Sequence, residues 1–105
     1  MRSVDCYNES RMTDRPSREL QTLRRGIDAL DRRIAPLLAR RFALAVRTAA
    51  FKRALRDAAR ERAVLRGVLS SSRARGASAR ALAAVYRELF RRSLLLQRSA
   101  RRERC

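Results

Sequence analysis

A long seam of apolar residues dominates the first half of the chain. From residue 20 to residue 51 the seam positions are separated alternately by three and four residues, which is the a/d pattern of a helix packed against other helices. The seam consists of Leu20, Leu23, Ile27, Leu30, Ile34, Leu37, Arg41, Leu44, Thr48 and Phe51. The pattern predicts one long helix that begins near residues 15–18, ends near Arg53 and bends at Pro36.

Helical periodicity resumes twice in the second half of the chain. One segment runs from about Asp57 to Ser70, and another, with Ser78 as its expected N-cap, runs to about Ser99. Strand signals are almost absent. We therefore expect an all-α fold with one long helix and two shorter ones. The residues after the long helix cannot cover its length of roughly 50 Å, so we expect a homodimer in which two long helices share a core.

The chain is expected to form one domain with two short tails. Residues 1–14 are polar and without periodicity, which predicts a disordered N-terminal tail. Residues 15–99 form the helical domain, and residues 100–105 form a basic C-terminal tail that we expect to fray.

The net charge of +17 is compatible with a basic helical nucleic-acid-binding protein, which is the alternative from another class. Of the 27 basic residues only Lys52 is a lysine, and the arginines are spread over all three helical segments. Such a distribution is typical of a genome-wide preference for arginine over lysine and not of a localised nucleic-acid-binding patch. We therefore do not expect nucleic acid to be the main partner.

Several kinds of chemistry are excluded by the residues that the chain lacks. It has no histidine, no cluster of metal ligands and no glycine-rich phosphate loop, so we expect no metal and no cofactor. Cys6 and Cys105 lie in the two tails, where we expect reduced thiols in a cytoplasmic protein. No apolar run reaches transmembrane length or has the character of a signal peptide, so we expect no membrane partner.

Polar residues occupy positions where each helix requires apolar ones. They are Arg41 and Lys52 on the long helix, Asp57 and Glu61 on the second helix, and Ser93 and Gln97 on the third. Arg41 and Lys52 are eleven residues apart, which is three turns plus about 20°, so both project from nearly the same side. Two such cations are suited to hold one small dianion between them.

Each pair also has a structural interpretation. Long cationic side chains often extend to solvent, acids in a first helical turn favour the helix dipole, and a serine and a glutamine can hydrogen-bond between helices. The sequence leaves these alternatives open for each pair alone. The three pairs together favour a common interior cavity.

The segments LRRGIDALDRRIAPLLARR, FK, DAARERAVL and SLLLQ resemble, in this order and spacing, the all-helical chorismate mutase family over about residues 18–98. The resemblance implies an intertwined dimer of three-helix chains that rearranges chorismate to prephenate. It also implies a set of site residues, which are Arg24, Arg41, Lys52, Asp57, Arg60, Glu61, Ser93 and Gln97. The single lysine of the chain falls on the family's lysine.

The implied reaction needs a held substrate and stabilisation of the charge that develops on the breaking ether bond. The resemblance implies that Arg24, Arg41 and Ser93 bind the carboxylates of the substrate, and that Lys52 and Gln97 donate hydrogen bonds to its ether oxygen. It also implies that Glu61, helped by Asp57, accepts a hydrogen bond from the ring hydroxyl, and that Arg60 supports the acids or the ligand. Elimination of pyruvate from isochorismate and rearrangement of aminodeoxychorismate are rival activities on the same scaffold.

Two geometric consequences follow from these positions. Lys52 and Glu61 are nine residues apart, or about 180° around a continuous helix, so the chain must break after Arg53 although no Gly or Pro lies there. Arg24 and Arg41 are seventeen residues apart, about 26 Å along the axis. One small substrate cannot span that distance, so we expect Arg24 to act across the dimer interface.

Overall fold

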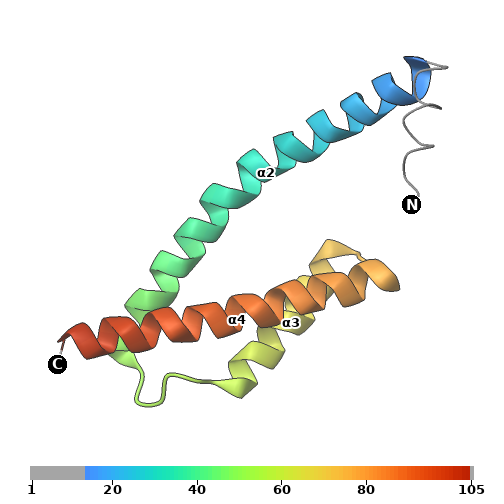
Figure 1. Ribbon diagram of the computed structural model, residues 1–105. Coiled ribbons are helices and arrows are strands. Elements are labelled where there is room, and N and C mark those ends of the chain that lie inside the picture. The colour runs from blue at the N-terminus through green and yellow to red at the C-terminus, as the bar shows by residue number, and fades with distance from the viewer. Residues whose placement is uncertain (1–13, 105) are drawn as a thin grey trace, which may run out of the picture. The chain divides into compact units, whose positions relative to one another are not determined.

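The computed structural model describes residues 14–104, which fall into two units, residues 14–39 and residues 40–104. The elements are α2 (Asp14–Thr48), the short 3-10 helix η1 (Ala49–Phe51), α3 (Ala58–Ser72) and α4 (Ala77–Arg104) (Figure 1). No strand occurs in the described part of the chain. The all-α fold with one long and two shorter helices is thus confirmed. The expected N-terminal tail, except Asp14, and Cys105 lie outside the described residues.

The first unit is the N-terminal part of α2, and its apolar seam is exposed. Leu23, Ile27 and Leu37 expose 65%, 56% and 58% of their surface. The neighbouring seam residues Leu20, Leu30 and Ile34 are exposed as well. Helical geometry continues through Pro36 without interruption. No described helix combines the length and apolar character needed to cross a membrane.

The long helix ends where the sequence offers no helix breaker. After α2 the chain tightens into η1, and Lys52 then adopts extended backbone angles, with φ −114° and ψ 139°. Residues 52–57 connect η1 to α3 without helix. The break required between Lys52 and Glu61 is therefore present, and α2 ends at Thr48, earlier than the expected end near Arg53.

Local capping explains how α3 begins and ends. Asp57 is its N-cap, and its Oδ1 accepts a hydrogen bond of 3.0 Å from the Arg60 backbone N–H. Arg73 ends the helix in the left-handed conformation with φ 61°. Gly76, at φ 56°, precedes α4 and suits this conformation because it lacks a Cβ. Ser78, the expected N-cap of the last helix, is instead the second residue of α4.

The second unit is organised around α4, which packs against α3 and η1. Its buried apolar residues are Ala49, Ala83 and Leu89, and they are joined by the buried polar residues Ser93 and Gln97. The helix continues to Arg104, beyond the expected end at Ser99. Arg101 falls in the stretch expected to fray; it lies within α4, and its guanidinium group binds backbone carbonyls of η1 and of the residues that follow it.

Candidate active site

A cavity of about 360 Å³ lies within the second unit, between the end of α2, the segment after η1, and helices α3 and α4. Its volume is in the usual range for sites that bind small molecules. It is lined by Arg41, Leu44, Ala45, Thr48, Lys52, Leu55, Asp57, Arg60, Glu61, Val64, Phe90, Ser93, Leu94 and Gln97. Seven of the eight site residues expected from the sequence are among them, and Arg24, in the first unit, is not.

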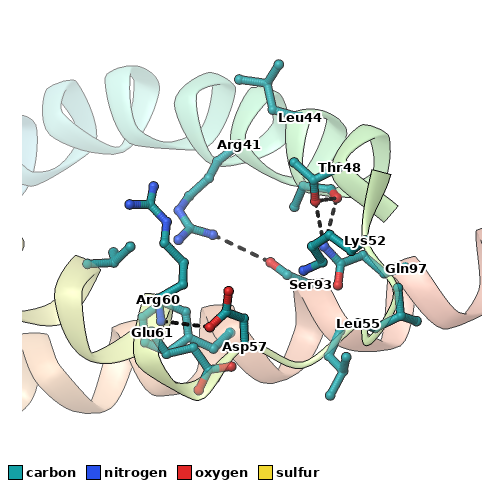
Figure 2. A pocket seen from close by; sticks show the side chains of 14 residues that line it. Arg41, Leu44, Thr48, Lys52, Leu55, Asp57, Arg60, Glu61, Ser93 and Gln97 are labelled. Atoms are coloured by element: carbon teal, nitrogen blue, oxygen red, sulfur yellow. Dashed lines mark hydrogen bonds between the residues drawn. The ribbon is translucent and has the colours of Figure 1, made fainter. Parts of the chain in front are cut away.

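Arg41 is the cation that interrupts the apolar seam, and aromatic rings accommodate it. Its guanidinium carbon lies 5.6 Å from the centre of the Tyr86 ring and 5.8 Å from that of Phe90, which are favourable cation–π distances. Nη1 also donates to Ser93 Oγ over a long 3.5 Å. Figure 2 shows the side chain directed from α2 into the cavity. This arrangement orients the charge and leaves most of its donors unused.

Gln97 ties α4 to the end of α2 from a position that is only 5% exposed. Its Nε2 donates to the Ala45 carbonyl at 2.8 Å and to Thr48 Oγ1 at 3.1 Å. The Ala45 oxygen can only accept, which fixes the amide with nitrogen on this side. Both Nε2 hydrogens are therefore engaged in this structure, and the amide oxygen is the group left for another partner.

Lys52 reaches the cavity from the first residue after η1 (Figure 2). The extended backbone at this residue turns the chain out of the helix, so the side chain faces the cavity together with Arg41. Lys52 is half-buried. Its ammonium group makes no hydrogen bond or ion pair with another described residue, so its three donors are available to a bound anion.

The two acids are placed by α3 and already have structural partners. Asp57 caps the helix through Oδ1, as the structural interpretation of an acid at a helix start proposed. Glu61, one turn later, accepts from Arg56 Nη2 at 3.5 Å. Both also line the cavity, and Figure 2 shows the Asp57 carboxylate directed inward. The functional and structural interpretations therefore apply to the same side chains.

The cavity combines three cations, Arg41, Lys52 and Arg60, with two carboxylates, Asp57 and Glu61. The apolar part of the wall includes Leu55, Val64 and Phe90. Such a wall favours a small anion with a compact apolar body and a hydroxyl group, because cations meet the anionic groups and carboxylates accept from the hydroxyl. The described residues contain no group of three or more potential metal ligands.

Some residues that shape the cavity were missed in the sequence. Tyr86 and Phe90 follow an ordinary apolar pattern, which gave no sign that they receive the Arg41 guanidinium group. Thr48 was assigned only to the seam, although its hydroxyl accepts from Gln97. Arg101 lies in a run of arginines, where its three bonds to carbonyls have no sequence signal.

Comparison with known proteins identifies the family of this chain. The model of the family "Chorismate mutase type II" matches residues 23–98, which is most of the described chain. Searches of curated proteins and of solved structures gave no match. The matched range begins just before Arg24, ends just after Gln97, and so contains every residue of the cavity. The protein therefore belongs to the chorismate mutase type II family.

Proposed function

We propose that the protein is a chorismate mutase that rearranges chorismate to prephenate. The observation that carries the proposal is the cavity itself, in which Arg41, Lys52 and Arg60 face two carboxylates within a member of this family. Chorismate carries two carboxylates, an enolpyruvyl ether and a ring hydroxyl. The charges and hydrogen-bonding groups of the wall match each of these.

The chemistry of the rearrangement agrees with the residues that are present. One carbon–oxygen bond breaks while one carbon–carbon bond forms within a single molecule, so neither a nucleophile nor proton transfer is needed. The wall must hold the side chain of the substrate over its ring, which removes much of the entropic barrier. Arg41, oriented by Tyr86 and Phe90, is placed to bind a carboxylate through its fork of donors.

Lys52 is proposed to stabilise the transition state. As the ether bond lengthens, negative charge builds up on its oxygen, and an ammonium group beside it interacts more strongly with the transition state than with the substrate. The unused donors of Lys52 and its partial burial support this role. An ammonium group in a partly water-excluded site acts more strongly than one in bulk water.

Gln97 is proposed as the second donor to the ether oxygen, and this role requires one bond to be exchanged. Releasing Thr48 Oγ1 is the easier change, because the Thr48 hydroxyl keeps its own 2.7 Å hydrogen bond to the Ala45 carbonyl. Such an exchange costs about 1 kcal/mol before the new bond forms. The bond from Nε2 to Ala45 continues to anchor the amide.

The acids are proposed to accept from the ring hydroxyl. Glu61 is released easily from Arg56, because their contact of 3.5 Å is long and Arg56 is 65% exposed. Asp57 keeps one oxygen on the helix cap and has the second available. Arg60 is proposed to balance the charge of the acids or to contact the substrate, and Ser93 to bind a carboxylate beside Arg41.

We further propose that the active protein is a homodimer in which Arg24 comes from the second chain. The exposed seam of the first unit supports this, because half-exposed leucine and isoleucine side chains gain about 1 kcal/mol each when a partner covers them. Arg24 precedes Arg41 by seventeen residues, about 26 Å along a helix, which is farther than one small substrate extends.

Exchange of subunits tests the shared site. Inactive Arg24→Ala and Lys52→Ala proteins are mixed and allowed to re-pair. Each mixed dimer then has one intact site and one site with both lesions, so random pairing restores about a quarter of the wild-type activity. Confirmed mixed dimers without activity would show that Arg24 does not act across the interface.

The function is tested by incubating the purified protein separately with chorismate, isochorismate and aminodeoxychorismate, and identifying the products. We expect prephenate from chorismate as the fastest reaction. Pyruvate from isochorismate, or a rearranged amino product, at a higher kcat/KM would assign one of the rival activities. Turnover of none of the three would refute the proposal.

A further inference from the structure

Arg101 joins α4 to η1 and the residues after it through three hydrogen bonds. Its Nη2 donates to the carbonyls of Ala49 and Lys52, both at 2.7 Å, and its Nη1 donates to the carbonyl of Arg53 at 3.2 Å. The bonds to Ala49 and Lys52 are partly buried. Short charge-assisted bonds of this kind are among the stronger hydrogen bonds in proteins.

These carbonyls belong to the residues that determine where Lys52 points. Ala49 begins η1, Lys52 is its extended C-cap, and Arg53 is the next residue. Carbonyls at the end of a helix lack partners within the helix, and no Gly or Pro in residues 52–57 fixes the turn. The bonds to Arg101 therefore hold the peptide group that directly follows Lys52, together with one peptide group earlier in the chain, at Ala49, and one later, at Arg53.

We propose that Arg101 is a positioning residue that fixes the backbone of Lys52 and thereby aims its ammonium group into the cavity, an inference that rests on the function proposed above. Arg101 itself does not line the cavity. It acts only through the direction of Lys52. Because a misplacement of about 1 Å can cost a hundredfold in rate, loss of Arg101 is expected to lower kcat more than it raises KM.

The first test measures the backbone without any substrate. Endoproteinase Lys-C cleaves after lysine, and Lys52 is the only lysine of the chain, so cleavage of the tag-free folded protein reports local opening at this residue. Arg101→Ala is expected to be cleaved at least about tenfold faster than wild type, because the segment then opens more often. Arg102→Ala is the matched control, since Arg102 is exposed and contacts none of these carbonyls. Equal cleavage rates in the two variants would overturn the proposal.

The second test asks whether Arg101 acts through Lys52. With chorismate as substrate, Arg101→Ala is expected to lower kcat by about tenfold to a hundredfold, and Arg102→Ala to leave it unchanged. In a Lys52→Ala background the same Arg101 substitution is expected to change kcat less than about twofold, because the group it positions is gone. Independent, multiplicative losses would overturn the positioning role.

The remaining outcomes are also decisive. If wild type lacks mutase activity while Arg101→Ala is still cleaved faster, the proposed function fails and Arg101 is only a backbone clamp. Should Arg101→Ala not fold, Arg101→Gln is used, since one amide donor remains; intermediate cleavage and intermediate kcat support the proposal. A general loss of helicity by circular dichroism in both variants would make Arg101 a determinant of the whole fold and overturn the proposal.

Discussion

Replacement of Arg41 by methionine should separate the stability of this fold from its activity. Arg41 occupies a seam position that suits an apolar residue, yet its guanidinium group contacts Tyr86 and Phe90 and lines the cavity. An apolar side chain of similar length can keep the ring contacts but cannot bind a carboxylate. The Arg41→Met variant should therefore fold normally and catalyse poorly.

The change in stability is small because losses and gains are similar. Two cation–π contacts at a partly exposed position contribute about 0.5–1 kcal/mol each, and the 3.5 Å bond to Ser93 contributes about 0.5 kcal/mol at most. The methionine regains about 0.3–1.5 kcal/mol from contact of its sulfur with the rings. Ser93 can turn its hydroxyl to a carbonyl one turn earlier in α4. The free energy of unfolding should thus fall by about 1 kcal/mol, and by no more than about 2 kcal/mol.

The change in activity is much larger. Removing a preorganised charged donor from a catalytic site typically costs about 3 kcal/mol, which corresponds to about a hundredfold in kcat/KM. Stability is measured by urea unfolding followed by circular dichroism, and activity by prephenate formation. Arg40→Met, the neighbouring exposed residue that does not line the cavity, is the matched control.

Two results would refute this reasoning. A kcat/KM within about threefold of the Arg40→Met control would show that Arg41 does not bind the reacting substrate. A loss of more than about 3 kcal/mol in unfolding free energy would show that the guanidinium group is a main element of stability, since such losses accompany broken buried networks.

Three further predictions concern single side chains. Lys52→Ala should lower kcat by about a hundredfold without changing helicity, and near-normal turnover would remove Lys52 from the mechanism. Gln97→Glu should shift the pH optimum of the activity downward, because a carboxyl group donates a hydrogen bond only when it is protonated. The variant should also lose stability as the pH rises, because its buried carboxyl can donate to the Ala45 carbonyl only in the protonated form, which burial favours. An unchanged pH profile of activity would contradict the contact assigned to Gln97. Hydrogen bonds from Arg91 and Arg92 lower the pKa of the exposed Glu88 carboxyl from 4.5 to about 2. The stabilisation from these ion pairs should therefore be complete above pH 4.5 and be lost as the pH falls through about 2. An NMR titration that gives Glu88 a pKa near 4.5 would contradict the ion pairs.

The sequence allowed the helices to be predicted because their signals are local. The three- and four-residue spacing of the seam predicted α2, and the acid at Asp57 marked the start of α3. The end of α2 was placed too late, since no local breaker lies near Lys52. The carbonyls around the break are instead satisfied by side chains of α4, about fifty residues away in the sequence.

Most of the cavity was predictable for a similar reason, and its details were not. Arg41 and Ser93 were identified because a polar residue on an apolar face needs a partner. Periodicity gives the face of a helix but not the rotamer of a side chain. It therefore could not show that Gln97 uses both donors on α2, or that Glu61 turns to Arg56.

The bonds that hold the end of the long helix have an evolutionary consequence. The acceptors at residues 45, 49, 52 and 53 are main-chain carbonyls, while the donors are the side chains of Gln97 and Arg101. Every amino acid, proline included, supplies such a carbonyl. Mutations at Ala49 or Arg53 therefore leave the acceptors in place, whereas each donor can be lost by one substitution. Among relatives that keep this joint, selection for these bonds should act on α4, whereas the facing segment should be constrained by the burial of Ala49 and the role proposed for Lys52, and not by the bonds themselves.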